Sequence, residues 1–541
     1  MSLKEVIKKD NFVIHLYEKI AVSTENILHF ENGDFILDTG TFIYKKQTGL
    51  AALRDLYRDF DPGEFDFKAL QGQFCVLLYK NKKLYIWNDY FGIYHLFTDD
   101  QCRIVSSSFL AVVRQKKTKQ INRQAMYEYV CEGASYSDDT YIKGVKLLDA
   151  FNIHELGLKV STWRKKYMFE PAKANDYDTR IELTVESLID YFDTLKKCFG
   201  NNACSALSGG YDSRLILALL SKVEIDPHLY VYGADKSADV RVATGIAAAE
   251  NLSILHDSKT RGKLSLEQFQ EITQKEYFYC DGHGPNGVIS NGAEFDARTV
   301  RSDAADLQLN GGGGEIFRNF WKLPDRPISI AAFLKSRFDH LPATTFKAGF
   351  DRGIYLSNLQ IKIQHMLEID SPVLTRTDLE RLYVYMRIKY WMGYNTSIQN
   401  LRCYALIPLA EPVFAYPSFS IPFKHKEMGA FEAALIKRLN PKLAAYNSSY
   451  GYNFSDRPGR KAAFANSLQQ NLPVSAQRLL RKLKYSSSAL EMPYFLQQQY
   501  IDAVVPEKGL LSNEYFNLEN IRDPLMLSRL QTVNLVLSDP F

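Results

Sequence analysis

A glycine-rich turn at residues 208–213, with the sequence SGGYDS, is the strongest chemical signal in the chain. It lies between a short apolar run and the apolar run RLILALL, an order that predicts a strand, a tight turn and a helix. Glycines let backbone N–H groups approach an anion, and a helix N-terminus favours negative charge, so the turn predicts a phosphate site. An ordinary glycine turn with a capped helix is the alternative. The residues predicted to surround the phosphate are Ser208, Gly209, Gly210, Asp212 and Ser213.

A second glycine-rich segment follows the apolar run LQL and ends at Glu315. Four successive glycines add little to packing, so we expect their backbone to face phosphate, with a plain glycine loop as the alternative. The predicted contacts are Gly311, Gly312 and Gly313. Asp212 offers the hard oxygen ligands that Mg²⁺ prefers, and it is the first predicted metal ligand.

The elements that must position these turns alternate between strand and helix from about residue 178 to 325. A helical run (TRIELTVESLIDYF) is followed by the strand-like runs ACSAL, HLYVYG and SILHD, with apolar helical runs between them. This alternation predicts an α/β domain with a parallel sheet. Beyond about residue 325 the pattern is mainly helical, and a linker is expected at 163–177.

The first 160 residues have the pattern of short strands. Apolar and polar residues alternate between Asn-Gly and Thr-Gly turn signals, and GQFCVLLYKNKKLYIW reads as a hairpin. Helices are expected at LAALRDLYRDF and NRQAMYEYVCEG. The region is therefore predicted to be mainly β.

The turn SGGYDS resembles the pyrophosphatase loop (PP-loop) of synthetases that cleave ATP to AMP, and its surroundings resemble the asparagine-synthetase family. Tyr232 and Gly233, before a helix starting near Ser237, match the segment that lies beneath adenine in that family. The resemblance implies a PP-loop (HUP-like) domain over 178–541 that binds ATP and Mg²⁺. It implies that a small-molecule or peptide carboxylate is adenylated and captured by an amine or ammonia, in an ATP-dependent ligation that forms a carbon–nitrogen bond.

The N-terminal region also resembles that family, in its glutaminase domain. The run LQGQF at 70–74 and the run NDYFG at 88–92 match its motifs, which implies an Ntn-like αββα sandwich over 1–165. That glutaminase uses an N-terminal cysteine, but this sequence begins Met-Ser-Leu and its first cysteine is Cys75. Ser2 would be a far weaker nucleophile, and Asn88 replaces the arginine of the motif. We therefore expect no glutaminase activity.

Two further departures concern the predicted synthetase site. Alignment on Glu-Ile-Phe puts Gly314 where the family has a metal-binding carboxylate, so Glu315 is the remaining candidate for the second metal ligand. Ser449 takes the place of a lysine that stabilises the acyl-adenylate. The nearest cations in sequence are Arg457, Arg460 and Lys461, with a solvated basic loop as the alternative. The predicted catalytic residues are Asp212, Glu315, Arg457 and Lys461.

Two other segments have open interpretations. The loop DGHGPNG at 281–287 lies where the family lines its acceptor pocket, and a plain surface loop is the alternative. The cations of the stretch 376–394 either pack along a helix or recognise substrate.

Composition excludes several classes of protein. The 541 residues are 46% hydrophobic and 24% charged, as in soluble globular chains, with a net charge of +4. The balanced charge and the lack of stacking aromatics in the basic runs argue against a nucleic-acid partner. Without a long apolar run or a paired cysteine framework, we expect a cytoplasmic protein with no membrane partner, and a homodimer stays open.

Three functions remain at this stage. The first is the ATP-dependent ligase without its own glutaminase, and the second is a nucleotide-binding or scaffolding pseudoenzyme that has lost catalysis. The third, PP-loop chemistry on tRNA, needs an RNA-binding face or catalytic cysteines that the sequence does not offer. The sequence does not identify the acid or the amine.

Overall fold

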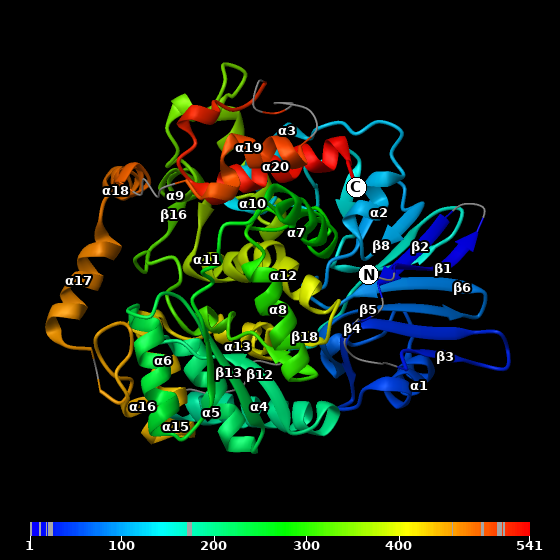
Figure 1. Cartoon of the computed structure of the whole chain (residues 1–541). Helices are drawn as coiled ribbons and strands as arrows, with labels where there is room; N and C mark the ends of the chain where they lie inside the picture. Colours follow the sequence, from blue (N-terminus) through cyan, green and yellow to red (C-terminus); the bar gives the residue numbers. More distant parts are fainter. Residues whose placement is uncertain are drawn as a thin grey trace.

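The protein is a mixed α/β chain with both parallel and antiparallel sheets, which many helices surround (Figure 1). The computed structural model describes residues 3–9, 12–17, 19, 25–169, 176–456, 458–487, 492–505, 511 and 514–541. Within these residues, no helix combines the length and the apolar character needed to cross a bilayer.

Two sheets pack face to face in the N-terminal region. The first, in spatial order, contains β1 (Leu3–Lys9), β2 (Phe12–Tyr17), β8 (Ile104–Ser106), β7 (Phe97–Asp99) and β9 (Val145–Leu147). The second contains β11 (Ser161–Arg164), β10 (Asn152–Leu156), β6 (Lys83–Asn88), β5 (Leu70–Lys80), β4 (Phe35–Tyr44) and β3 (Ile27–His29). Alternate residues of facing strands, such as Ile14, Leu77 and Val105, fill the space between the sheets.

Helices cover the two outer faces of this sandwich. α1 (Gly49–Asp59) packs on β4, and α2 (Phe109–Arg114) packs on β7 and β8. α3 (Arg123–Glu132) begins at the Asn122 cap and ends at Gly133, whose φ of 85° suits a glycine. The layers therefore run helix, sheet, sheet, helix, and the predicted helices at LAALRDLYRDF and NRQAMYEYVCEG are confirmed.

The predicted linker at 163–177 is partly wrong. Its first residues complete β11, and the Lys165 side chain is buried, with its ammonium donating to the backbone carbonyls of Asn88 and Asp89. Sequence could not reveal this because the partners lie nearly 80 positions away. Residues 170–175 lie outside the described residues, and α4 (Tyr177–Phe199) begins after the Asp176 cap.

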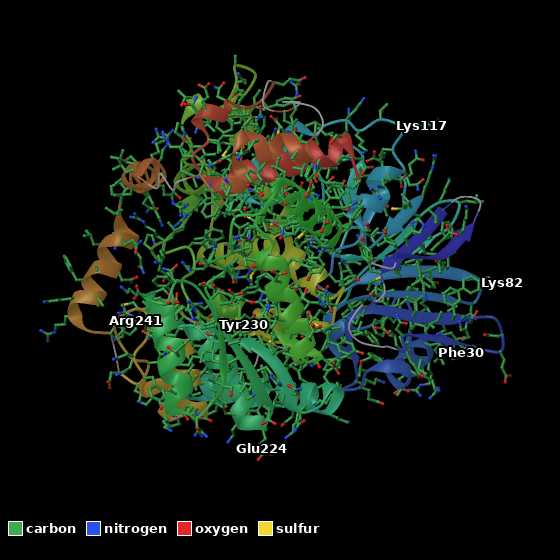
Figure 2. The ribbon with its side chains drawn as sticks, viewed as in Figure 1. Phe30, Lys82, Lys117, Glu224, Tyr230 and Arg241 are labelled. Carbon is green, nitrogen blue, oxygen red and sulfur yellow. The ribbon has the colours of Figure 1, made fainter. Side chains whose placement is uncertain are left out.

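The second region contains the predicted parallel sheet. Its strands, in spatial order, are β14 (Ile254–Asp257), β13 (Asp226–Tyr232), β12 (Asn202–Ala206), β15 (Leu307–Leu309) and β18 (Tyr404–Leu406), and all neighbours are parallel. The connecting helices include α5 (Tyr211–Val223), α6 (Ala238–Ala249), α7 (Leu266–Tyr279) and α8 (Ala293–Ala304). Figure 2 marks Tyr230 on β13 and Arg241 on α6. Strand order reverses direction between β12 and β15, and such a reversal leaves a crevice at the carboxyl ends of the strands.

Helices dominate after residue 330, as predicted, although β18 returns to the parallel sheet and was not foreseen. They include α9 (Ile330–Arg337), α10 (Arg352–Leu367), α11 (Arg376–Leu382), the π-helix η4 (Tyr383–Met392), α12 (Gly393–Gln399), α13 (Pro412–Ser418), α15 (Ala430–Leu439), α16 (Pro441–Ala445), α17 (Arg460–Asn471), α18 (Val474–Ser487), α19 (Gln498–Val504) and α20 (Pro524–Ser538). One apolar core joins α20 to α3 of the N-terminal region (Figure 1).

Candidate functional site

The turn 208–210 connects β12 to α5, as the sequence predicts, and lies at the carboxyl end of the sheet beside the reversal of strand order. Ser213 Oγ accepts from the Ser208 backbone N–H at 3.0 Å, and Ser208 Oγ accepts from the Gly210 N–H at 3.2 Å. The Gly209 N–H donates to the carboxylate of Asp239, in the first turn of α6, at 3.0 Å. A backbone N–H of this turn thus already holds one oxyanion.

Gly210 and Gly209 differ in their surroundings. A Cβ added at Gly210 would meet only ordinary contacts, 3.5 Å from Ser208 Oγ and from the Tyr450 hydroxyl. A Cβ at Gly209 would lie 2.5 Å from the Cβ of Ser449. The space beside Gly210 is therefore free, whereas Gly209 is required by the fold itself.

Ser449 lies directly against this turn. Its backbone N–H donates to the Gly209 carbonyl at 3.0 Å. The buried guanidinium of Arg214, on α5, holds the preceding segment by donating to the carbonyls of Tyr446 at 2.7 Å and Asn447 at 2.9 Å. The chain thus brings position 449 to the turn but presents a hydroxyl there instead of a cation.

The four glycines after β15 pack closely, contrary to the expectation that they have little packing value. A Cβ at Gly312 would lie 1.9 Å from Met392 Cε, and Gly313 has a φ of 92°. A Cβ at Gly314 would lie 2.4 Å from an oxygen of Asp212, and one at Gly311 would lie 3.2 Å from the Ser213 nitrogen. Close approach to α5, η4 and Asp212 explains the glycines, and their contact with phosphate stays a prediction.

A cluster of charges occupies the end of α5. The guanidinium of Arg318 lies 2.5 Å from an oxygen of Asp212 and 3.6 Å from one of Glu315. Its Nε lies 2.7 Å from an oxygen of Glu432, a fully buried residue of α15. Tyr383 donates its hydroxyl to the other Glu315 oxygen at 2.5 Å. The N-terminal end of α5, next to the turn 208–210, therefore holds a cluster of three carboxylates and one cation.

Burial changes the acidity of these carboxyl groups. It raises the pKa of Asp212 to about 6, although the nearby Arg318 acts in the opposite direction. Burial and the nearby Asp212 also raise the pKa of Glu432. Neither oxygen of Glu432 has a hydrogen-bond partner with favourable geometry among the described residues. With more carboxyl groups than cations, the cluster favours the uncharged form of some of them.

The residues present do not fit a magnesium ion. Arg318 already takes the Asp212 oxygen that the metal would need, and Gly314 leaves no room for the second carboxylate of the family pattern. No group of three or more acidic, histidine or cysteine side chains in the described part of the chain is arranged to hold a metal. The assignment of Asp212 and Glu315 as metal ligands is not supported by this geometry.

The predicted cations are not brought to this cluster by any described contact. Arg457 lies outside the described residues. Arg460 and Lys461 lie on the exposed face of α17, which Figure 1 draws at the outer edge of the molecule. The structure instead places Arg318 there, a cation that the sequence analysis did not consider. Its position three residues after Glu315 was the available signal, whereas nothing in the sequence singled out Glu432.

The end of β13 lies near the turn through α6. Gly233 has a φ of 131°, and Ser237 caps α6 by accepting from the Val240 N–H. The Tyr232 hydroxyl is buried and has no hydrogen-bond partner among the described residues, and the Lys259 ammonium lies 4.0 Å from the centre of its ring. The structure thus brings Tyr232, Gly233 and the 208–213 turn to the same edge of the sheet.

The N-terminal motif residues lie in a filled interior. Asn88 and Asp89 are buried, and the Lys165 ammonium lies against them. The cavity lined by Gly72 and Asp89 measures about 10 Å³, room for about one water molecule. Glu411, from the second region, accepts from the Gly72 N–H there at 3.0 Å. Ser2 lies outside the described residues.

The loop 281–287 is not the plain surface loop that one interpretation expected. Asp281 is buried and accepts from the Ser108 hydroxyl at 2.6 Å and from the backbone N–H groups of Phe109 and Leu110, so it caps α2. His283 stacks on the ring of Tyr129, 4.9 Å between centroids. The loop packs the second region against the N-terminal region. Sequence could not reveal that Asp281 caps α2, because the two lie more than 170 positions apart.

Comparison of the chain with protein-family models finds no match, and comparison with the curated proteins finds none. The resemblance to the asparagine-synthetase family therefore stays a prediction, carried by the motifs and now by the positions of these residues.

Proposed function

We propose that the turn 208–213 binds ATP and that the protein activates a carboxylic acid as its acyl-adenylate for capture by an amine. The observation that carries this proposal is the meeting of two glycine loops, after β12 and β15, where the strand order reverses. Nucleotides bind in open α/β sheets at such a reversal, with phosphate at a helix N-terminus. The Asp239 carboxylate on the Gly209 N–H supports an oxyanion site at that position.

In this reaction the acid's oxygen attacks the α-phosphorus of ATP, a new P–O bond forms, and pyrophosphate leaves with the electrons of the broken bond. The amine then attacks the acyl carbon, AMP leaves, and the amine loses a proton. The turn and the start of α5 bind phosphate oxygens through N–H groups and the hydroxyls of Ser208 and Ser213. We assign to Arg318, which also pairs with Asp212 and Glu432, the positive charge that Ser449 lacks, and no step is assigned to a metal held by the protein.

The finer fold assignments are part of the same proposal. The order helix, sheet, sheet, helix supports an Ntn-like N-terminal domain, and the strand order 14-13-12-15-18 supports a PP-loop domain. The cavity of about 10 Å³ beside Asp89 is too small for a glutamine side chain, which supports a source of nitrogen other than glutamine. The amine is then ammonia or an amine carried by a substrate.

A pseudoenzyme is the second candidate function, and one observation favours it. Arg318 neutralises Asp212 at 2.5 Å, and Gly314 replaces a carboxylate, so the metal site of the family pattern is lost. In that case ATP binds and is not cleaved. The protein would then act as a nucleotide-dependent scaffold.

Pyrophosphate exchange separates the two functions. We expect labelled pyrophosphate to enter ATP only when the correct acid is added, and Arg318→Met to lower this exchange by about 100-fold. Arg326→Met is the matched control, because Arg326 is exposed and lies eight residues away. Binding of ATP without exchange over a broad panel of acids would select the pseudoenzyme.

A further inference from the structure

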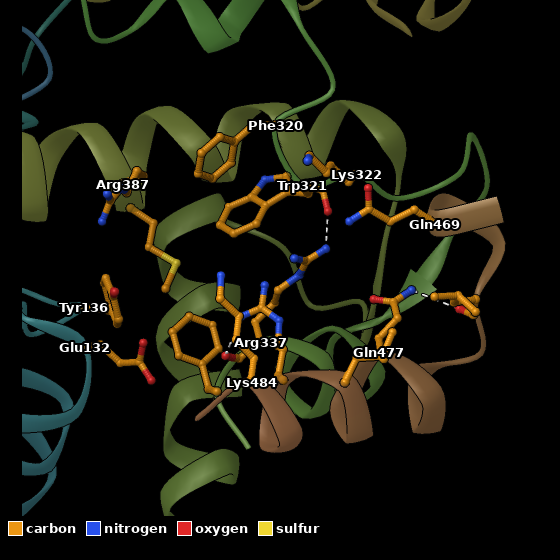
Figure 3. A pocket seen from close by; sticks show the side chains of 15 residues that line it. Glu132, Tyr136, Phe320, Trp321, Lys322, Arg337, Arg387, Gln469, Gln477 and Lys484 are labelled. Atoms are coloured by element: carbon orange, nitrogen blue, oxygen red, sulfur yellow. Dashed lines mark hydrogen bonds between the residues drawn. The ribbon is translucent and has the colours of Figure 1, made fainter. Parts of the chain in front are cut away.

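A cavity of about 520 Å³, within the size range of small-molecule sites, lies beside α18 (Figure 3). Its walls come from α3, the segment after η2, α9, η4, α17 and α18. Aromatic rings form part of the wall, including Tyr136, Phe320 and Trp321. The N-terminal region and the second region therefore both contribute to one chamber.

Cationic side chains dominate the lining of this cavity. They are Lys322, Arg337, Arg387, Arg481 and Lys484, against the single carboxyl group of Glu132. Figure 3 shows Arg337 and Lys484 near the centre of the chamber and Glu132 at its side. Lys322 and Lys484 are exposed, and the three arginines are half-buried. A surface of one charge sign raises the local concentration of ions of the opposite sign.

Several of these cations form no ion pair within 4 Å among the described residues, although Glu132 lies near Arg481. Lys322, Arg337, Arg387 and Arg481 form no ion pair with a carboxylate there. The Arg387 guanidinium lies 3.5 Å from the centre of the Trp391 ring, and Arg337 Nε is buried without a hydrogen-bond partner. Burial and the nearby Arg481 lower the pKa of Arg337 to about 10, as expected for a largely buried cation without a carboxylate partner. Its guanidinium donates to the Trp321 backbone carbonyl.

The cavity lies one aromatic ring away from the charge cluster. Phe320 lines the cavity, and its ring lies 4.5 Å from that of Tyr383. Tyr383 in turn donates its hydroxyl to Glu315, which borders Arg318. A molecule in the cavity would thus approach the site at which the acid is adenylated.

We propose that this cavity binds a small organic molecule through an oxyanion group, either a phosphate or a second carboxylate. Arginine suits this task because its planar donors match both kinds of oxyanion. This assignment rests on the proposed function: the anion belongs to the end of the adenylated acid that does not react. The acid would then carry at least two anionic groups.

Calorimetric titration without nucleotide tests the cavity directly. The probes are glucose, gluconate, glucose 6-phosphate and 6-phosphogluconate, which share one carbon chain and differ in carboxylate and phosphate. We expect 6-phosphogluconate to bind at least about tenfold more tightly than glucose, and the two singly modified probes to show which oxyanion is preferred. Equal binding of all four probes, or no binding of any, would overturn the proposal.

Four variants locate the bound anion. Arg481→Gln and Arg387→Gln, on different walls, should each weaken 6-phosphogluconate binding by at least about tenfold. Lys482→Gln removes the same charge from a neighbouring position of α18 that does not line the cavity, and it should leave binding unchanged. Gly210→Val should also leave it unchanged, because the phosphate turn is elsewhere. Binding lost in Gly210→Val and kept in Arg481→Gln would place the anion at the turn and refute the cavity, while leaving the proposed function intact.

Discussion

The two regions of the molecule differ in the space that they leave for a ligand. Around Asp89, the N-terminal region leaves a cavity of about 10 Å³. The second region has a glycine turn at the carboxyl end of a sheet, and a cavity of about 520 Å³ whose wall residue Phe320 contacts Tyr383 of the charge cluster. Both places carry motifs of the same family resemblance. In the first, the side chains of Lys165 and Glu411 fill the interior. Lys165 donates to the Asp89 carbonyl, and Glu411 accepts from the Gly72 N–H. In the second, the backbone forms the glycine turn that the resemblance implies, and the side chains at positions 314 and 449 differ from the family pattern.

The difference teaches that the backbone geometry implied by a motif and the side-chain chemistry implied by it need not occur together. A sandwich of sheets stays stable when its interior is filled, because burial of apolar and paired polar groups favours folding. In the second glycine loop, by contrast, Met392 and Asp212 lie against the backbone, so packing alone explains why glycines occur there. We therefore expect the first region to support the fold and the second to bind ligands.

The largest expected effect is on the stability of the second region, when the cation of its charge cluster, Arg318, is removed. Arg318→Met leaves Asp212 and Glu432 buried without their cation, which should lower the free energy of unfolding by about 3 kcal/mol. Adding Glu432→Gln should restore part of this loss. Urea unfolding of both variants and of the exposed control Arg326→Met measures the effect. An unchanged midpoint in Arg318→Met would show that the cluster does not depend on its cation.

Gly210→Val tests the phosphate turn. The φ of Gly210 is −89° and a Cβ there meets only ordinary contacts, so the variant should fold normally. The added methyl groups occupy the space that phosphate needs, and ATP affinity should fall by at least about 100-fold, or about 2.7 kcal/mol. Gly245→Val, in α6 with no atom within 4 Å of its added Cβ, is the control. Calorimetry that finds equal ATP affinity in a folded Gly210→Val protein would place the nucleotide elsewhere.

The sequence predicted the strand, turn and helix around residue 210 because those signals are local. Alternating apolar runs likewise predicted the parallel sheet, but β18 is three residues long and lies within a helical region. Arg318 and Glu432 are 114 positions apart, so no pattern of spacing could join them. The packing of the glycines against Met392 and the burial of Asp281 were unpredictable for the same reason.

A smaller effect is the pH dependence of stability that Glu132, in the wall of the 520 Å³ cavity, is expected to cause. Burial raises the pKa of Glu132 from 4.5 to about 8, despite the nearby Arg529 and Arg481. Between these pH values the folded chain holds a proton that the unfolded chain has released, so stability should fall as pH rises from 4.5 to 8. Glu132→Gln cannot ionise and should show a shallower fall. Urea midpoints at the two ends of this range measure it, and an identical fall in both proteins would contradict the assignment.

The smallest expected effect is the absence of glutamine hydrolysis at the closed N-terminal site. Incubation with glutamine should release no glutamate above that seen without protein, and Ser2→Ala should change nothing, because the cavity beside Asp89 has room for about one water molecule. A coupled glutamate assay measures this. Glutamate release that disappears in Ser2→Ala would show that the N-terminal region is catalytic and would break the contrast between the two regions.

Photolabelling with 8-azido-ATP tests the central claim most directly, because it reports where the nucleotide base lies. We expect the photolabel to be attached to the tryptic peptide 223–236, which contains Tyr232 and Gly233 at the end of β13. Excess ATP should prevent this labelling, and Gly210→Val should abolish it. A label that ATP does not displace, or that maps to the N-terminal sheets or to the walls of the 520 Å³ cavity, would contradict a nucleotide site at the glycine turn.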